Sequence, residues 1–234
     1  MSVRDDLRRL AQAGLTFDAP LSAERADGLV GALAISPGHH VVDLGCGWGE
    51  LLLRMLAARP ATTGTGVDRD RAALDRGRRL AAQRGLQERA EFVEADAASF
   101  DDRGDVVICV GASHVWSGPT ASLRALRSRV DPGGLVLYGG GFWAKRPDAV
   151  ARRAIGELPV FDGLLQSAQR AGFRIEQADR STLTEWDSFE GSWRAALEAS
   201  GDADAIAYAE ERRQEYEDGY RDALGFAWLV LAPT

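Results

Sequence analysis

The residues best suited to binding chemistry lie in a glycine-rich segment in the first quarter of the chain. Glycines stand at alternate positions, Gly45, Gly47 and Gly49, directly after an apolar run that is typical of a buried strand. A run with helical spacing begins at Glu50. Such a strand–turn–helix lets the backbone approach a ligand closely, and the helix N-terminus supplies free N–H donors. The segment therefore predicts a ligand-binding loop, with a tight turn that binds nothing as the alternative.

The residue after the third glycine restricts the kind of ligand. The fingerprint of nicotinamide and flavin dinucleotide sites has a glycine where this chain has Glu50. A carboxylate at the start of a helix would repel a pyrophosphate. The loop is therefore better suited to a ligand without phosphates.

Two further carboxylates follow the next two predicted strands. Asp68 ends the second strand, where a carboxylate can accept hydrogen bonds from both hydroxyls of a ribose. Asp96 follows the third strand and could accept a hydrogen bond from an adenine amino group. For each residue the alternative is a structural role as a helix cap or turn residue. The glycine loop and Asp68, taken together, favour a nucleoside-type ligand.

The pattern of apolar residues indicates how these groups are positioned. Two short helices are expected before residue 38, with Ser22 capping the second. Strands alternating with helices indicate βαβ units and a doubly wound parallel sheet of the α/β class. Strands are predicted over 40–44, 63–67, 91–94, 105–110, 135–138, 173–177 and 226–231; helices between them are predicted over 50–58, 71–84, around 123–130 and over 161–171.

We interpret the chain as one domain, because the run at 226–231 is needed to complete the sheet. Its parts are a helical N-terminal segment over 1–37, a Rossmann-like core over 38–181, a helical lid insertion over 182–224 and a final strand over 225–234.

Composition excludes several classes of protein. The 234 residues carry 28 Lys and Arg against 35 Asp and Glu, a formal charge of −7, which argues against binding along a nucleic-acid backbone. Two cysteines cannot form a disulfide framework or a cysteine-based zinc site, and the three histidines do not form a metal set. No apolar run reaches the roughly 18–20 residues of a membrane span. We expect a cytoplasmic protein without metal.

The motifs occur together in the order and spacing of a known family. The sequence resembles the class I S-adenosylmethionine-dependent methyltransferases over residues 38–140. The resemblance rests on the glycine loop with its preceding aspartate (43–49), Asp68, Asp96-Ala97, the run 105–107 and the Asp-Pro-Gly-Gly run at 131–134. It implies a seven-stranded sheet of order 3-2-1-4-5-7-6, in which only the last strand is antiparallel.

The same resemblance implies a cofactor site. Gly45 and Gly47 would pack against the methionine part of S-adenosylmethionine, and Asp43 would help to orient it. Arg69 stands where many relatives place an apolar residue against the adenine, so its aliphatic stem would have to make that contact. The cofactor set is Asp43, Gly45, Cys46, Gly47, Gly49, Asp68, Arg69, Asp96, Ala97 and Val110, and the product would be S-adenosylhomocysteine.

The acceptor side has a weaker signal. Residues 111–114, 140–143, 184–187 and 224–226 resemble a narrower bacterial group of small-molecule methyltransferases. His114, four residues past the fourth strand, could act as a base or contact the acceptor, with a structural role as the alternative. Trp116 and Trp143, at the ends of strands, and Trp186, in the insertion, are candidates for the acceptor pocket.

These observations predict methyl transfer to an oxygen or nitrogen atom of a small organic acceptor. The alternatives are a nucleic-acid or ribosomal methyltransferase and a nucleotide-binding module without catalysis on the same fold.

Overall fold

The computed structural model describes residues 3–234, so the first two residues of the predicted N-terminal segment lie outside the described residues. Within this range, seven strands form one sheet of order β3-β2-β1-β4-β5-β7-β6. The strands are β1 (His40–Leu44), β2 (Thr63–Asp68), β3 (Ala90–Glu94), β4 (Gly104–Val110), β5 (Val130–Trp143), β6 (Phe173–Arg180) and β7 (Leu224–Pro233). Strand β7 runs antiparallel to both of its neighbours, and the other pairings are parallel. The predicted order and direction are confirmed.

The parallel strands are buried on both faces. In β4, Val106 and Ile108 pack on one side of the sheet, while Val107 and Cys109 pack on the other. This explains the continuous apolar character of the run, because alternate side chains of a strand enter opposite layers. The first layer contains α2 (Ala23–Ala32), α3 (Glu50–Ala58) and α4 (Arg71–Gln83), and the second contains α5 (Pro119–Arg129) and α7 (Phe161–Arg170).

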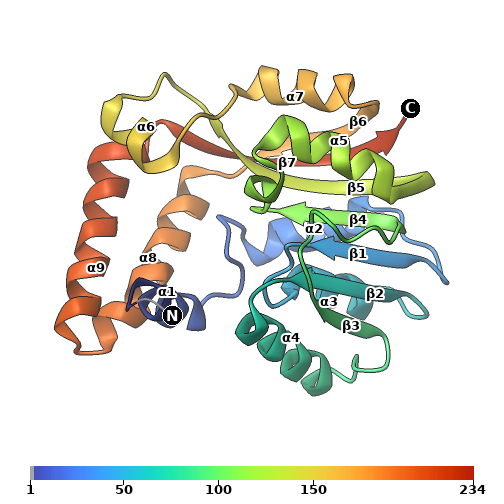
Figure 1. The fold of residues 1–234 in the computed structure, drawn as a ribbon, viewed down its shortest axis with the longest axis horizontal. Coiled ribbons are helices and arrows are strands. Elements are labelled where there is room, and N and C mark those ends of the chain that lie inside the picture. The colour runs from blue at the N-terminus through green and yellow to red at the C-terminus, as the bar shows by residue number, and fades with distance from the viewer. Residues whose placement is uncertain (1–2) are drawn as a thin grey trace.

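Several helices gather beyond the carboxyl ends of the parallel strands, at the left of Figure 1. They are α1 (Val3–Ala13), α6 (Ala149–Ile155), α8 (Leu183–Ala199), α9 (Ala203–Gln214) and a π-helical turn over Glu215–Tyr220. A separate small core joins α1, α8 and α9 and includes Trp48 from the glycine turn. None of the helices among residues 3–234 is both long and apolar enough to cross a membrane.

The largest differences from the sequence prediction are in two elements, while β6 and β7 are longer than predicted by a few residues. Strand β5 runs from Val130 to Trp143 rather than over 135–138, and α6 was not predicted. The strand continues through three glycines, and neighbouring side chains occupy the space where their side chains would lie: rings of β7 at Gly139, Tyr138 at Gly140 and Leu158 at Gly141. A Cβ atom on Gly139 would lie 2.9 Å from the ring of Trp228, and one on Gly140 or Gly141 would also be crowded. Trp143 is therefore part of the sheet and not of a loop.

Candidate functional site

The glycine turn joins β1 to α3 and is held against the end of β2. The backbone N–H groups of Gly45 and Cys46 both donate to the carbonyl of Val67, at 2.8 and 3.0 Å. Gly45, Gly47 and Gly49 all have positive φ angles, at 75°, 55° and 67°, which glycine adopts without the strain that a side chain would bring. The turn thus depends on the glycines for its backbone path.

The three glycines differ in what surrounds them. A Cβ atom on Gly45 would lie 2.3 Å from the Cβ of Ala112, and one on Gly49 would lie 2.6 Å from the ring of Phe92. At Gly47 no atom lies within 4 Å of such a Cβ position. Gly45 and Gly49 are therefore required by packing, whereas Gly47 borders open space that a ligand can enter.

Asp68 supports the turn from the end of β2. Its Oδ2 accepts a hydrogen bond from the N–H of Gly47 at 2.8 Å, and its Oδ1 accepts one from the N–H of Asp70 at 2.8 Å. The N-cap of α4 is Asp70, which accepts from Ala72 at 2.9 Å. Asp68 is therefore not the N-cap of α4, because Asp70 has that role. A carboxylate offers about four acceptor positions, so Asp68 retains capacity for ribose hydroxyls.

Asp96 and Arg69 form an ion pair at the neighbouring strand end. Asp96 also accepts a hydrogen bond from the N–H of Ala98 at 3.0 Å. The Ala98 N–H and then the Arg69 guanidinium hold the pKa of Asp96 below its ordinary value. If an adenine amino group donated a hydrogen bond to Asp96, the carboxylate would accept from both the adenine and Arg69.

Asp43 is the buried carboxyl group of the site. It is the second-last residue of β1, it is 4% exposed, and no donor among residues 3–234 hydrogen bonds to it. Burial, and then the negative charge of Asp68, raise the pKa of Asp43 to about 8. A buried carboxyl group without a partner in the chain is suited to a cationic ligand group.

These groups border one cavity of about 560 Å³ at the carboxyl ends of β1 to β4. Ten of the predicted residues line it: Asp43, Gly45, Cys46, Gly47, Asp68, Arg69, Asp96, Ala97, Val110 and His114. Gly49 does not, because it faces the ring of Phe92. The cavity lies where ligands bind in open α/β sheets.

His114 lies at the rim of this cavity, on a short 3₁₀ helix, η1 (Ser113–Trp116). The residue is exposed, and its imidazole makes no hydrogen bond within the described part of the chain. Its ring nitrogens are therefore available to a bound molecule.

The three tryptophans lie elsewhere. None of them lines this cavity or the second cavity described below. Trp143 is in β5, Trp116 packs against the layer of α5, and Trp186 lies among Phe189, Tyr216, Tyr220 and Phe226. The indole N–H groups of all three are buried and have no hydrogen-bond partner among residues 3–234. That these tryptophans contact an acceptor stays a prediction, and their positions outside both cavity linings do not support it.

The N-terminal segment contributes to the cavity in a way that sequence reasoning missed. Residues 8, 9 and 12 of α1, and residues 16–19 and 21 of the link to α2, line it. The indole N–H of Trp48 donates to the carbonyl of Thr16 at 2.9 Å, and Arg76 donates to the carbonyls of Gln12 and Leu15 at 2.8 and 2.5 Å. These bonds use backbone carbonyls, which have no signature in the sequence.

Charge in and around the site is balanced mainly by arginine. Glu50, at the start of α3, is paired with Arg54 at 2.9 Å and with Arg84 at 2.7 Å. Among residues 3–234 no group of three or more His, Cys, Asp or Glu side chains is placed to hold a metal ion.

Comparisons with known proteins agree with this geometry. Residues 41–134 match the family model described as a methyltransferase domain. The chain is 29% identical over 200 residues to the uncharacterized protein YjhP of Escherichia coli K12, covering 80% of each chain. It is 36% identical to the ubiquinone biosynthesis O-methyltransferase of E. coli O127:H6, but that match covers only 50% of this chain and 45% of the relative.

A solved structure gives the same fold. The S-adenosylmethionine-dependent methyltransferase of Geobacter sulfurreducens, crystallised with S-adenosylhomocysteine, superposes with a TM-score of 0.88 at 24% identity, covering 98% of both chains.

Proposed function

We propose that the chain is a class I S-adenosylmethionine-dependent methyltransferase and that it methylates an oxygen or nitrogen atom of a small organic acceptor; the match of residues 41–134 to a methyltransferase domain and the shared fold support this proposal. The observation that carries this proposal is the free imidazole of His114 at the rim of the cavity that also contains the glycine turn. The acidic net charge of the chain favours a small acceptor over a nucleic acid.

The residues present fit the cofactor. Gly47 leaves open space at the turn, Asp68 retains acceptor capacity, and Asp43 offers a buried carboxyl group to a cationic group such as the ammonium of the methionine part. The cofactor supplies a methyl group on a positively charged sulfur, which an acceptor can attack without further activation of the methyl. The protein therefore has to position the two reactants and exclude water.

His114 has the one acid–base role in this proposal. When a hydroxyl or amine attacks the methyl group it loses a proton, and a histidine can accept that proton near neutral pH. A positioned base contributes about 10²–10⁴-fold to such a step. The exposure of His114 lets the proton pass on to solvent.

The proposal is tested with methyl-labelled S-adenosylmethionine and a metabolite extract of the source organism, followed by mass spectrometry of labelled products. We expect a labelled small molecule with the wild-type protein, and kcat reduced about 10²–10⁴-fold in His114→Ala with unchanged cofactor affinity. His39→Gln, at the opposite end of the sheet, is the matched control and should keep its activity. Label that appears only in nucleic acid, or a His114→Ala variant with unchanged kcat and KM, would contradict the proposal.

A further inference from the structure

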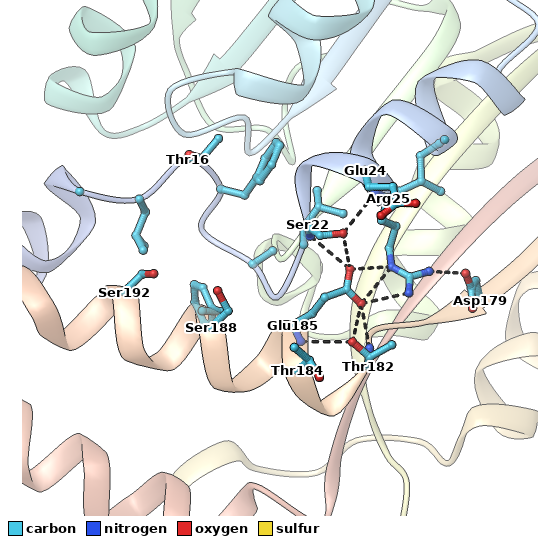
Figure 2. Close-up of a pocket in the computed structure, with 18 of the residues that line it drawn as sticks. Thr16, Ser22, Glu24, Arg25, Asp179, Thr182, Thr184, Glu185, Ser188 and Ser192 are labelled. Carbon is cyan, nitrogen blue, oxygen red and sulfur yellow. Dashed lines mark hydrogen bonds and ion pairs between the residues drawn. The ribbon is translucent and has the colours of Figure 1, made fainter.

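A second cavity, of about 730 Å³, lies beside the first and shares only residues of the link between α1 and α2 with it. Its walls come from residues 14–22, the first half of α2, the end of β6 and one face of α8. Figure 2 shows Ser188 and Ser192 on α8, across from the segment that carries Thr16. The volume lies within the range of about 300–1,000 Å³ that is usual for small-molecule sites.

The two cavities adjoin. Thr16, Phe17, Ala19 and Leu21 line both of them, so the link between α1 and α2 is their common wall. On the other side of this wall are Val110 and His114. An acceptor with its reactive atom at His114 would reach the second cavity only by passing this wall at Ala19 and Leu21, so a long acceptor would contact residues of both cavities.

The polar lining of the second cavity consists mainly of hydroxyl groups and carboxylates. The hydroxyl side chains are Thr16, Ser22, Thr182, Thr184, Ser188 and Ser192. The lining includes three carboxylates, Glu24, Asp179 and Glu185, but only one cationic side chain, Arg25. The hydroxyls of Ser22 and Thr182 already donate to Glu185. The other four hydroxyls can donate and accept hydrogen bonds, so they can bind neutral hydrogen-bonding groups of either kind.

The charge of Arg25 is already used within the chain. Its Nε and Nη2 atoms donate to the two oxygens of Glu185 at 2.8 and 3.0 Å, and its Nη1 atom pairs with Asp179. No partner within the described residues offsets the charge of Glu24, which is exposed at the cavity wall. The cavity therefore has an excess of negative charge and no cation free to bind an anion.

The carboxylate of Glu185 is held in place by several hydrogen bonds and stays charged. Besides Arg25, it accepts hydrogen bonds from the N–H and hydroxyl of Ser22 at 3.1 and 2.8 Å and from the N–H of Thr182 at 2.8 Å. Although burial by itself raises the pKa of Glu185, the bonds from Arg25, Thr182 and Ser22 outweigh it and lower the pKa to about 2. The group stays ionised at any physiological pH and joins the start of α2 to the start of α8.

We propose that this second cavity holds the part of the acceptor remote from the methyl-accepting atom, and that it selects neutral or cationic molecules rich in hydrogen-bonding groups over anions. This inference rests on the function proposed above. It names Ser188 and Ser192 as residues that contact the acceptor, because both lie on the face of α8 that lines the cavity.

The experiment is a ligand-observed NMR screen of a fragment library with equal numbers of neutral, cationic and anionic compounds, on the full chain loaded with S-adenosylhomocysteine. Each hit is repeated on Ser192→Trp and Ser188→Trp, which fill the cavity from an exposed helix position. Ala195→Trp, on the same helix but outside both cavity linings, is the matched control.

We expect a set of hits whose affinity falls at least tenfold in Ser192→Trp and Ser188→Trp but not in Ala195→Trp, and we expect this set to be neutral or cationic. No hit of this kind, or a set in which carboxylates and phosphates predominate, overturns the inference. Titration of wild-type protein with S-adenosylhomocysteine is done in parallel. If S-adenosylhomocysteine does not bind, the proposed function itself is wrong. If it binds normally but the tryptophan variants weaken no fragment, only this inference is wrong.

Discussion

Replacement of Asp43 by asparagine should make the cofactor-free protein more stable while weakening its cofactor binding. Asparagine has the shape of a protonated aspartate, so it preserves the packing of this 4% exposed side chain and removes only the titration. The pKa of Asp43 is raised from 3.8 to about 8, first by burial and then by the charge of Asp68. Because the folded-state pKa lies above the unfolded value, protonation of Asp43 favours the folded state, and this contribution is lost as the pH rises from about 4 to about 8.

The size of the effect follows from the shift. One pKa unit corresponds to about 1.4 kcal/mol, so a shift of about four units gives the substitution a gain of at most roughly 4 kcal/mol at pH 7. Water in the adjoining cavity moderates the burial, and we expect about 1–3 kcal/mol. The gain should increase with pH up to about 8, by at most about 1.4 kcal/mol per pH unit, and then level off.

The assay is urea unfolding of the cofactor-free wild type and Asp43→Asn between pH 5.5 and 9. Asp102→Asn, an exposed aspartate with the same change of charge, is the control and should show no such trend. Affinity for S-adenosylhomocysteine, measured by calorimetry, should fall about tenfold or more in Asp43→Asn through loss of a charge-assisted contact. A stability difference that does not vary with pH would refute the reasoning about burial, and unchanged affinity would refute the role in binding.

Three further substitutions separate binding from folding. Gly47→Ala should lower affinity for S-adenosylhomocysteine more than stability, whereas Gly45→Ala should lower the Tm more, since its Cβ would lie 2.3 Å from that of Ala112; equal Tm losses would count against this distinction. Asp68→Ala should cost about 2–4 kcal/mol of cofactor binding by calorimetry, while Asp70→Ala should cost about 1 kcal/mol of folding stability through its lost cap and lower affinity less, although Asp70 lines the same cavity; the reverse pattern would move the ribose contact away from Asp68. Glu190→Gln removes the charge that faces Arg212 at 2.8 Å between α8 and α9, so it should cost about 3–5 kcal/mol in urea unfolding, and a cost under about 1 kcal/mol would show that the packing of these helices does not depend on this pair.

Most of the fold was predictable because its signals are local. The strand–turn–helix around Gly45, the cap at Ser22 and the two-sided burial of β4 each depend on residues that are neighbours in the chain. The same holds for Asp43, Asp68 and Asp96, because the carboxyl ends of parallel strands meet at one edge of the sheet. Their placement along one cavity follows from the order of the strands.

The parts that could not be predicted depend on contacts between distant segments. The bond between Ser22 and Glu185 joins residues 163 positions apart, and nothing in the spacing of either helix indicates the other. Strand β5 extends to Trp143 because it pairs with β7 as far as Leu224, and this pairing places an expected pocket residue in the core.

The sequence by itself determined the α/β class, the order of the motifs and the groups available to a cofactor, because periodicity and turn chemistry operate over a few residues. Only the tertiary structure decided which residues from distant segments complete the cavity around those groups. Trp48 and Arg76 hold the link between α1 and α2 as the common wall of two cavities by donating to its backbone carbonyls. Because every residue has a backbone carbonyl, the sequence does not show which ones will be bound.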